Sequence, residues 1–364
     1  MAGSGAVEDP WHPRVAAMSS RTRPPLVLAH RGACGYRPEH TLAAYELSVA
    51  MGADYIEPDL VMTRDGVLVD RHEPEIGGTT DVAARPEFAD RRVTKLLDGA
   101  QVTGWWVEDF TFEELRSLRA IERLPSIRPG NTGYDGLWEV PTFEEVLVLR
   151  AELSERYGRT IGIIPEIKHS TYLRSLGFDP EAATLDAVER FGLNRAEAPV
   201  WIQSFEVSNL IALRRDYGYL GRSLLLAEDG EAPYDLIAGG DQRSYADLFT
   251  AEGLAELAPW IEAIGPEKVM VIPRRADNTL GEPTSLVADA HAQGLLVMPW
   301  TFRAENHFLP SDLRLPEVDG VVVKSAIGRA REEAWAYLEA GIDGLFADNT
   351  DVYVAARNQF TDQA

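Results

Sequence analysis

The stretch that decides the fold spans residues 25–72 and contains PLVLAHRG (25–32), PEHT (38–41), GADYIEPDLV (52–61) and VLVDRH (67–72). Two apolar runs, 25–30 and 55–61, predict buried strands, and residues 41–51 between them predict a helix. The first strand runs directly into His30 and Arg31. The stretch therefore predicts a strand–helix–strand unit that carries chemically reactive side chains where its strands end.

Beyond residue 140, strand-like and helix-like runs alternate to the end of the chain. The further strands are expected at 160–167, 200–205, 219–227, 268–272, 295–302 and 344–347, and helices at 142–157, 180–191, 207–217, 245–264, 284–293, 329–340 and 350–360. Eight apolar strands, each followed by a helix, predict an α/β fold of the (β/α)8, or TIM barrel, type. An open doubly wound sheet is the alternative, but no Gly-x-Gly-x-x-Gly turn follows the first strand.

The segment 73–140 interrupts this alternation. It is rich in Asp, Arg, Thr, Gly and Pro and contains a single predicted helix, 111–118, with Thr111 and Glu114 spaced as a capping box. Because it is too long for an ordinary strand–helix loop, we expect an insertion after the second strand that shapes the site. Residues 1–24 are expected to be a flexible tail, and 25–364 a single barrel domain.

The composition of the chain limits the kinds of partner that the protein can bind. The chain of 364 residues has a formal charge of −23, which would repel nucleic acid, so any phosphate site needs its own local positive groups. No apolar run is long enough to span a membrane. The single cysteine, Cys34, excludes an intrachain disulfide. Without a signal-peptide pattern we expect a cytoplasmic protein; an exported protein given in its mature form is the alternative. Oligomeric state is left open.

Three carboxylates are candidate metal ligands. Glu57 and Asp59 are two residues apart on one strand and therefore point to the same side, and Glu166 lies on the neighbouring strand. Oxygen ligands without cysteine suit a hard divalent cation, Ca²⁺ or Mg²⁺. The alternative is a structural ion cluster in which Arg31 and Lys168 neutralise the same carboxylates.

The remaining strand-end groups suit phosphate chemistry. His30 and His72 are candidates for acid–base catalysis, while Arg31 and Lys168 are candidates for binding phosphate oxygens. Two weaker candidates for substrate binding are Gln203, which alternatively ties strands together, and Trp300, which alternatively covers the barrel core as an aromatic lid. His169 is expected only to border Lys168.

Taken in order, these motifs resemble the glycerophosphodiester phosphodiesterase family. The resemblance rests on His-Arg-Gly (30–32), Pro-Glu-x-Thr (38–41), 52–59, 63–66 with His72, Pro-Glu-Ile-Lys (165–168), Gln-Ser-Phe (203–205), Pro-Trp-Thr (299–301) and Asp-Gly (343–344). Motifs within 73–140 look like the larger bacterial GlpQ-type branch. The resemblance implies a TIM barrel, a divalent cation, usually Ca²⁺ and sometimes Mg²⁺, and hydrolysis of glycerophosphodiesters to glycerol 3-phosphate and an alcohol.

Carried over by position, the resemblance implies three roles: Glu57, Asp59 and Glu166 as metal ligands, His30 and His72 as acid and base, and Arg31 and Lys168 on the phosphate. This sequence departs from the family pattern at His40, where Asn is usual, at Glu73, where Asp is common, and at 347–349, where Thr-Asp is typical. The head group of the substrate stays open.

The sequence leaves two other functions as alternatives. A sphingomyelinase D-like phospholipase shares the barrel and the paired histidines, but that family is shorter and usually disulfide-bearing. A catalytically silent barrel acting as a scaffold would have lost a metal ligand or a histidine, and all of them are present here.

Overall fold

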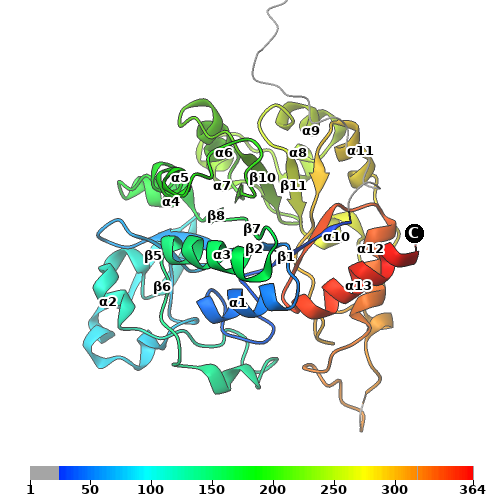
Figure 1. The fold of residues 1–364 in the computed structure, drawn as a ribbon, viewed down its shortest axis with the longest axis horizontal. Helices are drawn as coiled ribbons and strands as arrows, with labels where there is room; N and C mark the ends of the chain where they lie inside the picture. Colours follow the sequence, from blue (N-terminus) through cyan, green and yellow to red (C-terminus); the bar gives the residue numbers. More distant parts are fainter. Residues whose placement is uncertain (1–23, 318, 364) are drawn as a thin grey trace, which may run out of the picture.

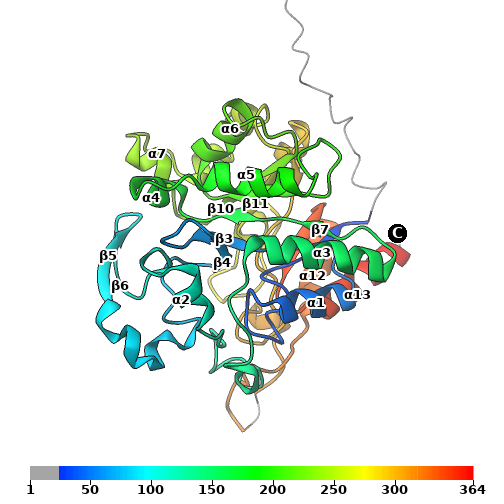
Figure 2. The ribbon, with the colours of Figure 1, turned by 60° about the vertical axis from the view of Figure 1, so that its left-hand side comes forward.

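The computed structural model describes residues 24–317 and 319–363. The predicted flexible tail, 1–24, lies outside these residues except for its last position. Figure 1 shows the chain viewed down its shortest axis, and Figure 2 shows it turned by 60°.

Within the described residues, parallel strands follow one another in chain order around a barrel. These strands are β1 (Leu26–Ala29), β2 (Tyr55–Ile56) continued by β3 (Asp59–Met62), β7 (Gly162–Ile163) continued by β8 (Glu166–Ile167), β9 (Trp201–Ser204), β10 (Arg222–Ala227), β11 (Ala263–Pro266), β12 (Leu296–Val297) and β13 (Gly344–Ala347). Their ladders give the orders β13-β1-β2-β7 and β12-β11-β10-β9-β8-β3. A parallel bridge between Ile163 and Val200 joins the two orders, and one between Phe302 and Ala347 closes the ring. The fold is a TIM barrel, as predicted.

Prolines divide the second and third strand positions. Pro58 separates β2 from β3 and Pro165 separates β7 from β8, because proline has no N–H to donate to a ladder. Both proline carbonyls still accept from the neighbouring strand, Pro58 from the N–H of Glu166 and Pro165 from that of Gln203. The interruptions therefore lie beside the candidate metal ligands without opening the barrel.

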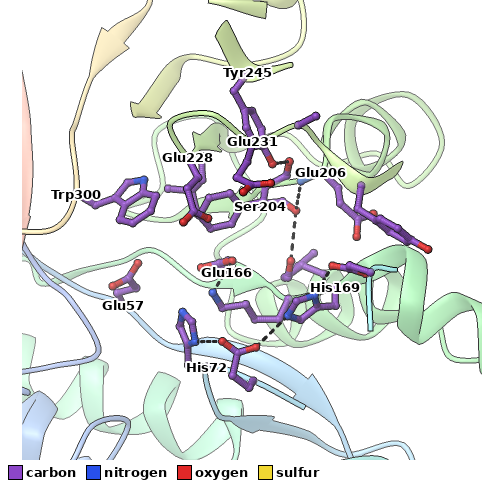
Figure 3. A pocket seen from close by; sticks show the side chains of 18 of the residues that line it. Glu57, His72, Glu166, His169, Ser204, Glu206, Glu228, Glu231, Tyr245 and Trp300 are labelled. Atoms are coloured by element: carbon purple, nitrogen blue, oxygen red, sulfur yellow. Dashed lines mark hydrogen bonds and ion pairs between the residues drawn. The ribbon is translucent and has the colours of Figure 1, made fainter. Parts of the chain in front are cut away.

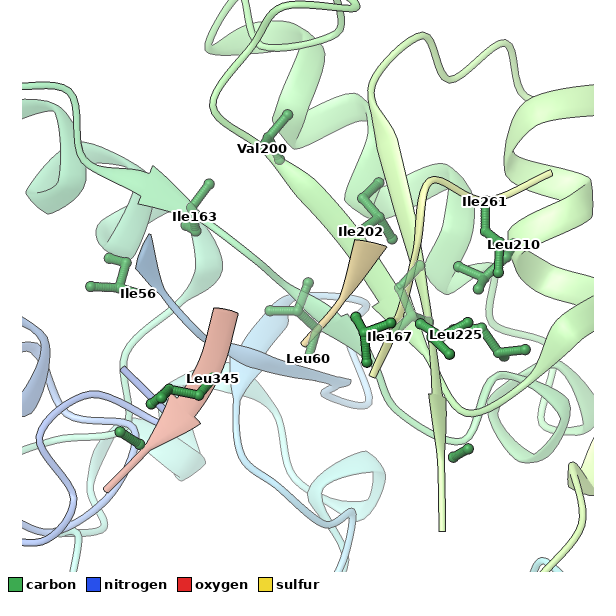
Figure 4. Packing of buried hydrophobic residues seen from close by; sticks show 14 of the residues in the cluster. Ile56, Leu60, Ile163, Ile167, Val200, Ile202, Leu210, Leu225, Ile261 and Leu345 are labelled. Carbon is green, nitrogen blue, oxygen red and sulfur yellow. The ribbon is translucent and has the colours of Figure 1, made fainter. Parts of the chain in front are cut away.

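Alternate residues of each strand face two different cores. Leu28, Ile164, Leu224 and Phe346 belong to a cluster made of strand and strand-end residues, which fills the barrel. Their neighbours in sequence belong to a second cluster that includes helix residues and lies between the strands and the surrounding helices. Figure 4 shows part of this outer layer, with Ile56, Leu60, Ile163, Ile167, Val200, Ile202, Leu210, Leu225, Ile261 and Leu345 labelled. Burial on both faces explains the continuous apolar runs.

Helices surround the barrel (Figures 1 and 2), and α12 packs against α13 and α1 against α3. The helices are α1 (Leu42–Ala50), α2 (Phe112–Arg116), α3 (Phe143–Tyr157), α4 (Ser170–Ser175), α5 (Pro180–Arg190), α6 (Val207–Arg215), α7 (Tyr234–Ala238), α8 (Tyr245–Leu248), α9 (Ala251–Leu257), α10 (Lys268–Val271), α11 (Leu286–Ala292), α12 (Ala330–Glu339) and α13 (Thr350–Gln363). The predicted capping box of α2 is present, and Thr142 and Glu145 form a second one at the start of α3.

Two predictions around the sixth strand were wrong. The expected helix 245–264 is divided into α8 and α9 and ends before β11, and the expected strand 268–272 is the helix α10. The apolar run in 268–272 has strand-like composition, but the barrel position is taken by Ala263–Pro266, where Gly265 faces the side chains of Leu224 and Leu226. The neighbouring strand therefore requires a small residue there, and this outweighs local β-propensity.

The segment 73–140 packs on β3 and on β4 (Leu68–Asp70), which is antiparallel to β3. Its own apolar cluster includes Ile76, Phe88 and Phe110 and joins Val61 and Val69 of these two strands. The segment also contains a hairpin absent from the sequence prediction, β5 (Val93–Leu97) and β6 (Ala100–Gly104), whose turn is Asp98-Gly99. The hairpin and α2 lie together on one side of the barrel (Figures 1 and 2).

Candidate active site

A cavity of about 540 Å³ opens at the C-terminal ends of the barrel strands (Figure 3). Its polar lining continues the alternation of the strands. Leu28 and Ile164 face the barrel interior, so His30 and Glu166, each two residues further on, point the same way. The predicted site residues that line the cavity are His30, Arg31, Glu57, His72, Glu166, Lys168 and Trp300.

The three candidate metal ligands form one buried cluster. Glu57, Asp59 and Glu166 each offer a carboxylate oxygen, and these oxygens lie within 4.8 Å of one another. Burial, with the neighbouring charges of Asp59 and Glu166, raises the pKa of Glu57 well above its usual range. Burial also raises the pKa of Glu166 to about 7. Asp59 Oδ1 is buried without a hydrogen-bond partner. The cluster thus fits a hard divalent cation.

Arg31 and Lys168 lie against these carboxylates and also line the cavity. Lys168 Nζ is 2.8 Å from Glu166 Oε1 and 4.0 Å from Asp59 Oδ2, and Arg31 Nε is 3.6 Å from the same Asp59 oxygen. Arg31 also donates its backbone N–H to Glu57. Three carboxylates face two cations, so neutralisation by protein groups alone is incomplete. The neutralising role and a role on phosphate are compatible in this geometry.

The backbone after β1 explains why glycine follows Arg31. Arg31 and Gly32 both have positive φ, 58° and 80°. A Cβ on Gly32 would lie 2.7 Å from the backbone carbon of Ala44 in α1, so only glycine permits this close approach. The turn brings the Arg31 N–H to Glu57 and directs His30 into the cavity.

His30 is held by a carboxylate. Its Nδ1 lies 2.6 Å from Asp348 Oδ1, and the other oxygen of Asp348 accepts from Arg128 at 2.5 Å and from Arg303 at 3.0 Å. Burial and the charge of Arg31 lower the pKa of His30 to about 4, against the opposing effect of Asp348. The Asp348 contact on Nδ1 leaves Nε2 as the nitrogen available to a substrate.

A second group near His30 is a structural network. His30, Cys34 and Asp348 also bring potential metal-binding atoms within 4.8 Å of one another. The oxygens of Asp348 are taken by His30 and two arginines, and burial raises the pKa of Cys34 well above its usual value. A neutral thiol beside an occupied carboxylate is a poor ligand set.

His72 is the first of a series of ionisable side chains in contact with one another. Its Nδ1 lies 2.6 Å from Glu73 Oε1, although without the in-line direction of a hydrogen bond. Glu73 Oε2 is 3.3 Å from His169 Nε2, and His169 Nδ1 is 2.6 Å from Asp98 Oδ2 (Figure 3). Burial, followed by nearby positive charges, lowers the pKa of His72 well below its usual value. His169 does more than border Lys168, because it bridges two carboxylates.

Gln203 and Trp300 are placed differently. Gln203 is fully buried, donates to Glu57 Oε1 at 2.6 Å and does not line the cavity, which supports the alternative that it ties strands together. Trp300 lines the cavity, donates from its indole N–H to the Gly265 carbonyl and stacks edge-on with Phe205. Both expected roles of Trp300, platform and lid, are compatible with this position.

Several residues that support the site are not evident from the sequence. Asp348 lies within 347–349, which the sequence marks only as a departure from the family pattern, and no sequence feature identifies Arg128 in the insertion. His40 is fully buried and lies between Asp59 Oδ2, at 2.9 Å, and the hydroxyl of Tyr45, at 2.8 Å. The unusual His40 therefore orients a candidate metal ligand. The sequence feature that could have identified His40 is its position in the Pro-Glu-x-Thr motif, where Asn is usual.

The part of the cavity lining that Figure 3 shows around Glu228, Glu231 and Tyr245 is acidic and aromatic. Glu228 and Glu231 are exposed, and no described basic side chain pairs with either of them. Partial burial of the carboxyl group, followed by the charges of Glu267 and Glu231, raises the pKa of Glu228. The apolar and aromatic part of the lining consists of Phe205, Leu226, Tyr234, Tyr245 and Trp300, of which Figure 3 labels Tyr245 and Trp300.

Comparison with known proteins assigns the family. The model of the glycerophosphoryl diester phosphodiesterase family matches residues 30–352. The glycerophosphodiester phosphodiesterase GDPD6 of Arabidopsis thaliana is 31% identical over 342 residues, 91% of this chain and 85% of that protein. The glycerophosphodiester phosphodiesterase of Haemophilus influenzae is 29% identical over 307 residues, 77% of this chain and 79% of that protein.

Solved structures share the fold. A candidate glycerophosphoryl diester phosphodiesterase from Silicibacter pomeroyi has a TM-score of 0.62 at 21% identity, covering 94% of this chain and 97% of that one. An Oleispira antarctica phosphodiesterase, solved with the product sn-glycerol-3-phosphate, has a TM-score of 0.56 at 17% identity, covering 93% and 99%.

The family match and the similarity to these relatives show that the chain belongs to the glycerophosphoryl diester phosphodiesterase family, whose members are phosphoric diester hydrolases. It is a glycerophosphodiester phosphodiesterase, which hydrolyses glycerophosphodiesters to glycerol 3-phosphate and an alcohol. No helix in the described part of the chain is long and apolar enough to cross a membrane.

Proposed function

We propose that this enzyme hydrolyses glycerophosphodiesters with a cationic alcohol, such as glycerophosphocholine or glycerophosphoethanolamine, to sn-glycerol 3-phosphate and the alcohol. We further propose that it does so with a divalent cation and histidine acid–base catalysis. The proposal rests on one observation: three buried carboxylates, the positively charged side chains of Arg31 and Lys168, and two histidines lie together at or next to one cavity.

Glu57, Asp59 and Glu166 would hold the cation. We propose Ca²⁺ rather than Mg²⁺, because a set of three carboxylates suits the larger, more flexible coordination of Ca²⁺, whereas Mg²⁺ usually keeps several waters. When bound, the cation supplies charge stabilisation to the phosphate oxygens. Arg31 and Lys168 bind and orient the same phosphate, and their fixed positive charge opposes the negative charge that develops during displacement.

The two histidines move the protons. Each has a carboxylate at Nδ1, Asp348 for His30 and Glu73 for His72, which directs Nε2 toward the reacting atoms. One histidine takes the proton from the nucleophile and the other gives a proton to the leaving alkoxide. The nucleophile is water or the 2-hydroxyl of the glycerol moiety. Phosphorus NMR during turnover distinguishes these routes, because attack by the 2-hydroxyl produces a cyclic phosphate first.

The acidic part of the cavity lining supports a cationic leaving alcohol. Glu228 and Glu231 offer negative charge to an ammonium group, while Trp300 and Tyr245 offer aromatic surface to it. An anionic head group would be repelled by the same carboxylates. The proposed preference therefore arises from the acidic and aromatic residues of the cavity lining rather than from the phosphate-binding groups.

The test is turnover of a panel of glycerophosphodiesters, with glycerol 3-phosphate as the readout. Choline and ethanolamine esters should be the best substrates, activity should be lost in EDTA, and Ca²⁺ should restore it better than Mg²⁺. Glu228→Gln and Glu231→Gln should raise KM for the choline ester and leave KM for glycerophosphoglycerol unchanged or lower. Full activity in EDTA would refute the proposed metal dependence. Preference for the anionic ester would refute the proposed preference for a cationic head group.

A further inference from the structure

Four ionisable side chains connect the catalytic cavity with the inserted hairpin. They are His72, which follows β4, Glu73 beside it, His169 at the start of α4, and Asp98 in the β5–β6 turn. The three contacts between them measure 2.6, 3.3 and 2.6 Å. All four line the cavity, where Figure 3 labels His72 and His169, and the proposed mechanism uses only His72 and Glu73.

The two residues of this series that lie farthest from His72, Asp98 and His169, adopt unusual backbone conformations. Asp98 and Gly99 have φ of 46° and 84°, as a two-residue type I′ hairpin turn requires. His169 has φ 47° and ψ 48°, a left-handed conformation that costs on the order of 1 kcal/mol for a residue other than glycine. The conformation of His169 puts its ring between the carboxylates of Asp98 and Glu73.

We propose that His169 is a positioning residue for catalysis: held by Asp98, it fixes the Glu73 carboxylate against Nδ1 of His72 and so orients the ring of His72. The proposal rests on the proposed role of His72 as acid or base. It also makes the inserted hairpin part of the acid–base apparatus, although Asp98 and His169 are 71 residues apart.

The geometry argues for this role because Glu73 has no other described anchor. Its side chain is 35% exposed, and its two oxygens contact the two histidines, one each. Without His169 the carboxylate would be free to rotate toward solvent and away from His72. His169 has no such freedom, since both of its ring nitrogens face carboxylates.

Charges around His72 make the position of Glu73 important. Four neighbouring groups disfavour the protonated form of His72 and so lower its pKa: Arg31, Lys168, Arg123 and His40. The carboxylate of Glu73 is the negative group in contact with the ring. Displacement of Glu73 would therefore change both the orientation of His72 and its readiness to hold a proton.

The experiment compares His169→Gln and Asp98→Asn with the wild-type enzyme. Asn suits the left-handed turn position, so Asp98→Asn removes the charge and keeps the hairpin. We expect His169→Gln to lower kcat about 10- to 100-fold with KM within about twofold, less than the loss of His72 itself. The pH profile of kcat should shift in both variants, and His169→Lys, which keeps a cation beside Glu73, should recover part of the loss.

The matched control is His291→Gln. His291 also pairs with a carboxylate, its Nε2 being 2.8 Å from Asp343 Oδ2, but it lies on α11 and does not line the cavity. This variant should keep the wild-type kcat and pH profile. A similar loss in His291→Gln would overturn the proposal by showing that any broken histidine–carboxylate pair impairs the fold.

A second readout does not depend on activity. NMR of ¹⁵N-labelled histidine reports which nitrogen of His72 carries the proton, and His169→Gln should change this tautomer population. Wild-type kcat together with unchanged His72 signals in a folded His169→Gln would overturn the proposal. If that variant does not fold, Asp98→Asn decides by the same criteria. If the wild type hydrolyses no glycerophosphodiester, the proposed function fails, whereas the His72 signals still decide the positioning role.

Discussion

At the scale of single residues, the site pairs each histidine with a carboxylate from a different part of the chain. Asp348 lies after the last strand and contacts His30, whereas Glu73 is the immediate neighbour of His72. Asp348 is buried and itself held by two arginines, but Glu73 is more exposed and depends on His169. The two histidines are therefore held with different rigidity, which suits different roles.

Replacement of each histidine by alanine should separate acid from base. His30→Ala and His72→Ala should each lower kcat on glycerophosphocholine by about 10²- to 10⁴-fold, because each removes one proton transfer. A p-nitrophenyl ester of glycerol phosphate leaves as a stable phenolate and needs no acid. The variant that lacks the acid should therefore recover on this ester, and the variant that lacks the base should not. Near-normal turnover of glycerophosphocholine by either variant would contradict the assignment.

The charge of His169 should appear in the pH dependence of stability. Burial opposes protonation, but hydrogen bonds to Asp98 and Glu73 raise its pKa to about 9, above the ordinary 6.5. The folded state thus binds this proton more tightly, so the stabilisation, up to about 3 kcal/mol, is complete below pH 6.5 and is lost as pH rises through about 9. Urea unfolding of wild type and His169→Gln should show a difference that shrinks over this range. A difference independent of pH would contradict the prediction.

At the scale of elements, prolines and caps determine where strands and helices stop. Pro58 and Pro165 interrupt two barrel strands next to the carboxylate cluster, so the strand ends can direct charged groups into the cavity while the ladder resumes beyond them. The helix α3, which follows the insertion, begins with a capping box of Thr142 and Glu145. Glu145 also binds Arg116 of α2, linking the insertion to the barrel.

The cap of α3 gives a prediction on stability. The Thr142 hydroxyl accepts from the N–H of Glu145 at 3.1 Å, and the Glu145 carboxylate accepts from the N–H of Thr142 at 2.9 Å. Thr142→Ala should therefore lower the free energy of unfolding by about 1 kcal/mol, as measured by urea denaturation. Thr142→Ser keeps the hydroxyl and should stay within a few tenths of a kcal/mol. Equal losses in the two variants would show that the methyl group, not the cap, is responsible.

At the scale of the whole molecule, strong negative charge surrounds a site that binds an anion. The formal charge of −23 disfavours the approach of a phosphodiester, and Arg31 and Lys168 oppose this field only within the cavity. A zwitterionic ester such as glycerophosphocholine is affected less than an anionic one. The overall charge and the acidic wall of the cavity thus favour the same class of substrate.

Ionic strength should separate these substrates. Salt screens the surface field over a Debye length of about 10 Å at 0.1 M. Raising salt from about 0.02 to about 0.2 M should lower KM for anionic glycerophosphoglycerol by about two- to fivefold and change KM for glycerophosphocholine little. The measurement is initial rate against substrate concentration at several salt concentrations. Equal changes for both esters would show that the surface charge does not discriminate between them.

Much of the fold could be predicted because strands buried on both faces leave an unmistakable apolar pattern. The sixth strand could not, since Ala263–Pro266 is small and short and its place depends on the neighbouring strands. The β5–β6 hairpin was also missed. Its strands are largely exposed, so they lack the alternation of apolar and polar residues that marks a half-buried strand.

The sequence by itself determined the class of chemistry, because His30, Glu57, Asp59, Glu166 and Lys168 lie at strand ends and a parallel barrel brings such ends together. Only the tertiary structure decided which groups touch. Closure of the ring brings Asp348 to His30, and the turn of the insertion brings Asp98 to His169. Local periodicity reports which face of an element is buried, whereas contacts between distant segments depend on how the barrel closes and where the insertion packs.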